Sequence, residues 1–316
     1  IKVEIPQMKN ASEPETATLT LKEDAGDKTF QGLVPEPNPR AVPPNGLEIY
    51  HLDVGQADSS ILRTPKNETV VIDTGNNGLV TRLALDELEV DRIDALVATH
   101  AHADHIGGHE YLIREFENNR NGVRRVYDNG VTTGSQVYAN YIDTVESFGI
   151  DLILPREGDT LPIDGATLDV LNPKDGSLNE IQHDNCVSVK ATADTSGTTW
   201  LQTGDANFTA EGRMLSSSVV DVSADIYNAG HHGASNSTSQ EFLDAIAPSY
   251  GIISSPLDSE FDHPKVETLN KLDAKEIPVY WTAKHGSVQT EADDPPVFNT
   301  ENSFSTDPAD FAAEKQ

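Results

Sequence analysis

Residues 99–109 read THAHADHIGGH and place three histidines and one aspartate close together: His100, His102, Asp104 and His105. Such a cluster is a poor way to build a hydrophobic core, whereas imidazole and carboxylate are ligands that zinc takes at roughly 2.0–2.2 Å. His100 and His102 alternate along the chain and can reach one ion, while Asp104 and His105 follow on the next turn and can reach a second. Because paired ions about 3.5–4 Å apart are a common hydrolytic device, the segment predicts a site for two zinc (or manganese) ions.

The elements that position this cluster follow from the hydrophobic pattern. Apolar residues 93–99 predict a buried strand that ends at the cluster, where open α/β sheets carry their sites, and a helix is expected from about residue 105 to 118. Other strands are expected at residues 47–54, 69–73, 123–127, 151–154, 167–171, 186–193, 198–203, 224–229, 249–254 and 277–281. Other helices are expected at residues 79–90, 135–148, 208–216, 238–246 and 264–273. This order predicts an α/β (α+β) fold with two sheets sandwiched between helices.

Further motifs narrow the class of protein. They are HLDVGQAD at residues 51–58, VIDTG at 71–75, LQTGD at 201–205, HHGAS at 231–235 and the pair His263–Pro264. With the histidine cluster they resemble the signature of the metallo-β-lactamase fold superfamily of metallohydrolases. The first motif also resembles the hydrolase domain of ComEC, the competence DNA-uptake channel. The resemblance covers about residues 46–290 and implies the four-layer αβ/βα sandwich of that family.

The same resemblance assigns the remaining metal ligands. Asp205 follows Gly204 at the end of an apolar strand, and in the superfamily this carboxylate bridges the two ions. One residue of the pair His231–His232 ligates the second ion while its neighbour faces the substrate, and we expect His231 to be the ligand. His183 is the candidate that completes the first metal site, with Asn185 as the weaker alternative.

Other residues are expected to assist the ligands or the substrate. The resemblance implies that His263 contacts the substrate or, like His232, assists the leaving group, so both join Asp104 as candidate catalytic residues. Asp73 is expected to orient ligand imidazoles through their second nitrogen, with Asp58 and Asn185 in similar supporting roles. His109 lies four residues after His105 and is expected to be exposed rather than to bind metal.

The charge balance limits the partners. The chain has 52 acidic and 22 basic residues, which gives a formal net charge of −30. Such self-repulsion is tolerable where salt screens it, and the composition resembles that of proteins from extreme halophiles, which predicts a halophilic archaeal source. Affinity for nucleic-acid phosphates comes from Lys and Arg, so tight non-specific DNA binding is not expected. The one basic pair that stands out is Arg124–Arg125.

The chain organisation suggests one main domain with two appendages. Residues 1–45 are expected to be an extension or linker, with one strand at 16–21, that is a candidate for self-association. Residues 46–290 form the predicted hydrolase domain, and residues 291–316 form an acidic tail. No stretch reaches the ~18 apolar residues needed to span a bilayer. Because the sequence starts at Ile1, a leader or anchor is expected outside it, and with it an extracellular or cell-surface location.

Three functions remain open from the sequence. The first is a phosphodiesterase or nuclease of the ComEC-like type, with a phosphoester and possibly DNA as substrate. The second is a hydrolase of small phosphoesters or other esters. The third is an extracellular scaffold or filament subunit that retains the fold without turnover. No nucleophile elbow or Walker loop occurs, which leaves serine-hydrolase and P-loop chemistry unsupported.

Overall fold

The computed structural model describes residues 16–23, 26–33 and 42–315, in two compact units, Ile1–Ala41 and Val42–Gln316. In the first unit, β1 (Thr16–Glu23) pairs with β2 (Gly26–Leu33) in an antiparallel ladder. The sequence predicted the first of these strands and missed the second. Residues 1–15, 24–25 and 34–41 of the predicted extension lie outside the described part of the chain.

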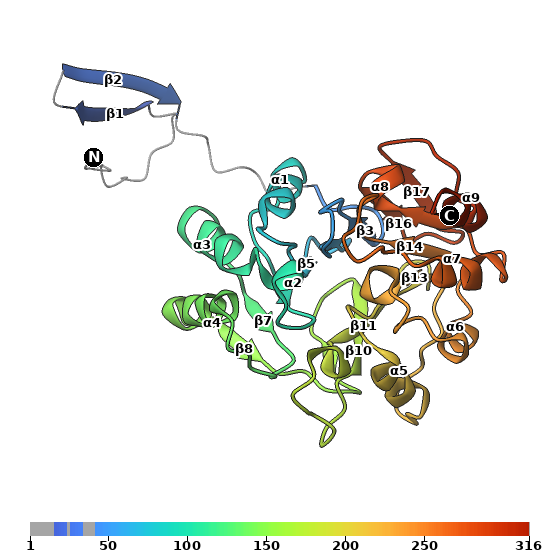
Figure 1. Ribbon diagram of the computed structural model, residues 1–316. Helices are drawn as coiled ribbons and strands as arrows, with labels where there is room; N and C mark the ends of the chain where they lie inside the picture. The colour runs from blue at the N-terminus through green and yellow to red at the C-terminus, as the bar shows by residue number, and fades with distance from the viewer. Residues whose placement is uncertain (1–15, 24–25, 34–41, 316) are drawn as a thin grey trace. The chain divides into compact units, whose positions relative to one another are not determined.

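The second unit is built on two mixed sheets (Figure 1). The first sheet contains, in spatial order, β17 (Val297–Thr300), β16 (Val288–Glu291), β3 (Glu48–His51), β4 (Ser60–Arg63), β5 (Thr69–Ile72), β6 (Ala95–Val97), β7 (Arg125–Tyr127) and β8 (Asp151–Ile153). The second contains β15 (Val279–Trp281), β14 (Tyr250–Ile253), β13 (Ile226–Asn228), β12 (Thr199–Gln202), β11 (Ser188–Ala193), β10 (Ala166–Asn172) and β9 (Thr160–Leu161). The strands from β5 to β8 run parallel to one another, as do those from β12 to β15.

Helices cover the outer face of each sheet. Those of the first half are α1 (Leu79–Glu87), α2 (Ala103–Ile106), α3 (His109–Asn119) and α4 (Gln136–Phe148). Those of the second half are α5 (Phe208–Leu215), α6 (Gln240–Ile246), α7 (Val266–Asp273), α8 (Thr282–His285) and α9 (Pro308–Glu314), with short 3₁₀ turns η1 (Gln182–Asn185) and η2 (Gly230–Gly233). None of the helices in the described residues is both long and apolar enough to cross a membrane.

Three hydrophobic clusters separate four layers of structure. In β5, Val70 and Ile72 point into the cluster between the two sheets, while Val71 points the other way, toward α1, α3 and α4. In β13, Ile226 joins the cluster between the sheets and Tyr227 joins the cluster beneath α5, α6 and α7. Successive side chains of a strand alternate between faces, so these short apolar strands bury both sides. The predicted four-layer αβ/βα sandwich is confirmed.

Two local features differ from the sequence prediction. The helix expected at residues 105–118 is divided into α2 and α3 at Gly107–Gly108, where the backbones of Asn76 and Gly78 leave no room for a side chain. A Cβ at Gly108 would lie 2.3 Å from Gly78 Cα. At the other end of the chain, β16 extends past residue 290, and β17 and α9 follow it. Ordered elements therefore extend into the predicted acidic tail.

Candidate metal centre

The predicted ligands converge at the carboxyl ends of the parallel strands. His100, His102, Asp104 and His105 follow β6, and Asp205 follows β12. The pair His231–His232 follows β13 within η2, and His183 lies in η1 just before β11. Loops from both sheets therefore meet at one place, as expected for sites of open α/β sheets.

A first group of potential ligands is formed by His100, His102, His183 and Asp205. The Nδ1 atom of His102 lies 2.9 Å from His100 Nε2 and 3.1 Å from His183 Nε2. The Nε2 atoms of His100 and His183 each lie 3.7 Å from Asp205 Oδ2. His183, the uncertain member of the predicted set, therefore stands with the two cluster histidines around one point.

A second group is formed by Asp104, His105, Asp205 and His232. Asp205 Oδ1 lies 3.2 Å from His105 Nε2 and 3.6 Å from His232 Nε2. Asp104 Oδ2 lies 3.4 Å from His232 Nε2 and 3.9 Å from His105 Nε2. Asp205 belongs to both groups and offers one oxygen to each, which is the arrangement that a bridging carboxylate requires.

The residues present fit metal ions. Ligands at about 2.1 Å in a tetrahedron are separated from each other by about 3.4 Å, which the distances in both groups bracket. Three atoms of the second group, His105 Nε2, His232 Nε2 and Asp205 Oδ1, are buried without a hydrogen-bond partner among the described residues. Because unpaired buried polar atoms are costly, three that face one another indicate a missing shared partner such as a cation.

Carboxylates and imidazoles in this centre shift one another's pKa. Burial alone would lower the pKa of His105, but Asp205 and Asp73 outweigh it and raise that pKa well above its ordinary value. Burial would raise the pKa of Asp205, yet His105 and His232 hold it well below its ordinary value. The pKa of His232 is raised to about 10 against its burial by Asp205 and Asp58. Protons on His105 and His232 would thus balance the carboxylates of the second group, and a cation that binds there would displace them.

Asp73 contacts Nδ1 of His105, the ring nitrogen that faces away from the second group. Its Oδ2 lies 2.7 Å from His105 Nδ1 and accepts a hydrogen bond from Thr99 Oγ1 at 2.7 Å, while Oδ1 accepts from Thr99 N at 2.9 Å. Asp73 adopts a left-handed backbone with φ 57°, which is unusual for a residue with a side chain. The bond at Nδ1 leaves Nε2 of His105 free for a metal ion, which is the orienting role that a carboxylate behind a ligand performs.

The pair His231–His232 lies at the edge of the two ligand groups, and its members differ in their contacts. His232 enters the second group, whereas His231 lies outside both groups and is bonded at Nδ1 to Asn236 Oδ1 at 2.8 Å. The Nδ1 atom of His232 lies 3.0 Å from Ser254 O and 3.4 Å from Asp58 Oδ1, which turns its Nε2 toward the site. Both histidines have left-handed backbones, with φ 52° and 55°. The turn of two consecutive left-handed residues brings both imidazoles to Asp205, with His231 Nε2 3.4 Å from Oδ2 and His232 Nε2 3.6 Å from Oδ1, but only His232 also reaches Asp104.

Hydrogen bonds from buried side-chain amides fix the loop that carries His183. Asn185 is no member of either ligand group; its Nδ2 donates to Ile181 O at 2.7 Å and to Asn179 O at 3.0 Å. Gln182 accepts from Ala101 N at 3.0 Å and so joins this loop to the histidine cluster. Sequence reasoning missed Gln182, because a glutamine beside a histidine carries no pattern of its own.

His263 lies beside the second group without belonging to it. Its ring centroid is 6.2 Å from that of His232 and 5.5 Å from that of His231. Gln56, whose Oε1 accepts from Ser259 Oγ at 2.6 Å, places its Nε2 3.3 Å from His263 Nδ1. This amide orientation makes Nδ1 the acceptor, so His263 carries its proton on Nε2. Burial, together with His232 and His231, lowers the pKa of His263 to about 4.

The expectation for His109 is wrong. It is completely buried at the start of α3, with Nδ1 2.9 Å from Thr74 Oγ1, and burial lowers its pKa to about 3. The break at Gly107–Gly108 puts His109 in a different helix from His105, and its ring packs against Tyr141 with the centroids 5.0 Å apart. The only cysteine, Cys186, is buried in the core as its position next to a strand suggests.

The fold and the site together indicate a class of metal-binding proteins: an αβ/βα sandwich that carries two adjoining groups of imidazole and carboxylate ligands at one end. The sequence model of the metallo-beta-lactamase superfamily matches residues 52–255, and the chain belongs to this superfamily. The match spans the residues of both ligand groups. The sequence motifs therefore identified the superfamily correctly.

Two bacterial proteins are similar to most of this chain. The chain is 26% identical to ComE operon protein 3 of Bacillus subtilis over 261 residues, which are 77% of this chain and 32% of that protein. It is 26% identical to competence protein ComA of Neisseria gonorrhoeae over 79% of this chain and 33% of that protein. The chain thus spans about a third of the length of these relatives.

Solved structures support the fold alone. The diiron beta-hydroxylase CmlA of Streptomyces venezuelae has a TM-score of 0.52 at 17% identity, over 80% of this chain and 55% of that one. The metallo-beta-lactamase fold protein YhfI of Bacillus subtilis has a TM-score of 0.51 at 12% identity, over 75% of this chain and 96% of that one. Because identity is low, neither neighbour carries an argument about substrate.

Proposed function

We propose that the chain is a metal-dependent phosphodiesterase of the ComEC-like type that holds two zinc (or manganese) ions. The observation that carries the proposal is the position of Asp205, which offers one oxygen to each ligand group. A shared carboxylate holds two ions close together, which is the spacing that hydrolytic dinuclear sites use.

The bound ions would supply an activated water at neutral pH and a counter-charge for the phosphoryl oxygens. The protein's own residues position the ligand imidazoles and the water. Asp73 and Asp58 fix the imidazoles of His105 and His232 through Nδ1. The carboxylate of Asp104 is 30% exposed and can accept a hydrogen bond from the attacking water.

His263 is suited to contact the substrate as a neutral hydrogen-bond donor. With a pKa of about 4 it is uncharged at neutral pH, and its Nε2–H can donate to a phosphoryl or leaving-group oxygen. Its neighbours Gln56 and Ser259 keep the ring in this tautomer. We therefore propose His263 as a substrate contact rather than as a charged proton donor.

A small phosphoester is the second candidate substrate, favoured by the charge of the chain. A formal net charge of −30 repels a polyanion, and contacts with DNA phosphates require Lys and Arg. A short ester pays little of this repulsion at moderate salt, because charges beyond about 10 Å are screened. Hydrolysis of single-stranded DNA and hydrolysis of a small diester should therefore be compared under the same conditions.

The test combines metal content with turnover. We expect about two zinc or manganese ions per chain by mass spectrometry and chelator-sensitive hydrolysis of bis(p-nitrophenyl) phosphate. Asp205→Asn is expected to abolish both, whereas Asp225→Asn, a change at the far end of β13, should leave both intact. Hydrolysis of the small diester without DNA cleavage would select the second candidate. Bound metal without turnover of any ester would favour a scaffold, and absence of metal would refute the site.

A further inference from the structure

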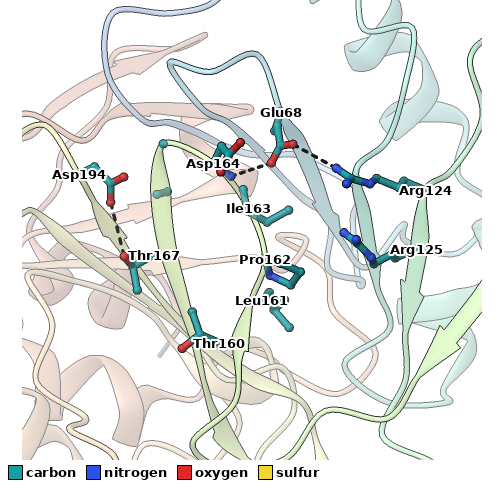
Figure 2. A pocket seen from close by; sticks show the side chains of 12 residues that line it. Glu68, Arg124, Arg125, Thr160, Leu161, Pro162, Ile163, Asp164, Thr167 and Asp194 are labelled. Atoms are coloured by element: carbon teal, nitrogen blue, oxygen red, sulfur yellow. Dashed lines mark hydrogen bonds and ion pairs between the residues drawn. The ribbon is translucent and has the colours of Figure 1, made fainter.

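A second concave site lies at the end of the sheets opposite the metal centre. Glu68 immediately precedes β5 and Arg125 opens β7, and these strands run parallel with β6 between them. The metal ligands instead follow the carboxyl ends of their strands. Between this edge and the turn from β9 to β10 is a pocket of about 440 Å³, within the size range of small-molecule sites (Figure 2).

Arg125 is an unusual residue on the wall of this pocket. Each of the other arginines in residues 42–315 pairs with a carboxylate. Arg125 makes no ion pair with a carboxylate in that part of the chain, although the sequence contains 52 acidic residues, and its nearby polar group is the hydroxyl of Tyr127, whose pKa burial raises and Arg125 lowers. It also lies two positions before Tyr127, a residue of the cluster between the sheets, so it points to the inner face of its sheet. A guanidinium directed inward without a carboxylate partner has five N–H donors, and a single hydroxyl leaves most of them free for a ligand.

The surrounding groups leave room for an anion next to Arg125. Glu68 is already used, because it accepts from Asp164 N at 2.7 Å and from Arg124 Nη1 at 3.3 Å. Asp194 lies across the pocket and accepts from Thr167 Oγ1 at 3.5 Å. Figure 2 shows Arg124 and Arg125 extending side by side from the start of β7 toward the pocket, with Pro162 facing Arg125 and the carboxylates at the other walls.

We propose that this pocket binds a small phosphate-bearing anion through Arg125, with Arg124 beside it. Two adjacent guanidinium groups favour a dianion, and a phosphate monoester carries a charge of −1.5 to −2 near neutral pH. The apolar wall of Leu161, Pro162 and Ile163 suits the organic part of a phosphorylated small molecule. The ligand can be inorganic phosphate or a phosphomonoester, since both offer the same oxygen atoms to the arginines.

The test is calorimetric titration of the metal-loaded protein with inorganic phosphate and with adenosine monophosphate at fixed ionic strength. Arg125→Gln is expected to weaken the binding that is not assigned to the metal centre by about tenfold to a hundredfold, as for the loss of charged hydrogen bonds. Arg125→Lys keeps the charge but not the planar fork, so it should weaken binding less. The matched control is Arg114→Gln on α3, where the arginine pairs with Glu110 at 3.0 Å on an exposed face.

The outcomes separate the possibilities. Saturable binding that is lost in Arg125→Gln and kept in Arg114→Gln supports the pocket, provided that the melting temperatures of the variants match the parent. Tighter binding of adenosine monophosphate than of phosphate identifies a phosphomonoester as the ligand, and equal binding identifies phosphate itself. Equal affinity in Arg125→Gln and the parent, or no saturable binding beyond the metal centre, overturns the proposal.

Discussion

Replacing Asp73 by Asn tests whether the second group of ligands holds a metal ion. The two residues have the same size, but Asn offers one acceptor oxygen and one NH₂ donor in place of two acceptors. Asp73 now faces His105 Nδ1 and Thr99 Oγ1 with one oxygen and Thr99 N with the other. If the Asn oxygen faces His105, the NH₂ group opposes the Thr99 N–H donor. If the NH₂ group faces His105, the proton of the imidazole must move to Nε2, which then cannot bind metal.

Either arrangement weakens the second site without removing a ligand. Changes in residues that orient metal ligands typically cost 10- to 100-fold in metal affinity or activity, or about 1.4–2.8 kcal/mol. We therefore expect Asp73→Asn to release one of two zinc ions 10- to 100-fold more readily in competition with a chromophoric chelator. The other ion should be held as in the parent, because His100, His102 and His183 are untouched.

The chain offers a matched control for this change. Asp225 accepts hydrogen bonds from the backbone N and the hydroxyl of Thr199 at 2.8 and 2.7 Å, much as Asp73 does from Thr99, but belongs to neither ligand group. Asp225→Asn should therefore destabilise the fold without changing zinc affinity. Equal zinc binding in Asp73→Asn and the parent, or an equal loss in both variants, would refute the assignment of the second site.

Three further results are expected. His232→Ala should bind about one zinc ion per chain and His231→Ala about two, as measured by mass spectrometry; the reverse pattern would restore His231 as the ligand. A chelator should lower the melting temperature of the parent by about 5–10 °C, since each site filled at a hundredfold excess over its Kd adds about 2.7 kcal/mol, and an unchanged temperature would contradict metal binding. Burial raises the pKa of Asp128 to about 6, above its unfolded value, so the folded chain binds this proton more tightly and stability falls as pH rises from about 4 to 6. Denaturant titrations should show Asp128→Asn gaining about 3 kcal/mol over the parent across that range, and a constant difference would contradict the shift.

Much of the centre could be predicted because its ligands are local in sequence. One loop after β6 supplies two members of each group, so spacing alone indicates two ions. Asp205 is equally visible, because a carboxylate after an apolar strand and a glycine stands at the edge where α/β sheets carry their sites. The periodicity also located most of the strands and helices, since short strands that bury both faces read as continuous apolar runs.

The rest depends on contacts between distant segments. Nothing in the pair His231–His232 reveals that Ser254 and Asp58 hold the second imidazole, since one partner follows β14 and the other precedes β4. The two glycines before His109 lie against the backbone of Asn76 and Gly78, a contact that the spacing of residues 99–109 does not reveal. The strands β16 and β17 escape prediction because they are short and half polar; β16 becomes a strand by pairing with β3 far back in the chain, and β17 by pairing with β16.

The contact between Gly204 and Thr99 explains how the two sheets act as one site. Gly204 has φ +54°, and a Cβ at this residue would lie 2.8 Å from the side chain of Thr99. Thr99 in turn donates twice to Asp73, which holds His105, while the residue after Gly204 is the carboxylate common to both ligand groups. The spacing between His105 and Asp205 is therefore set where the ends of β6 and β12 touch, and not by either loop alone. A glycine at this point brings the ligands of one sheet within reach of the ligands of the other.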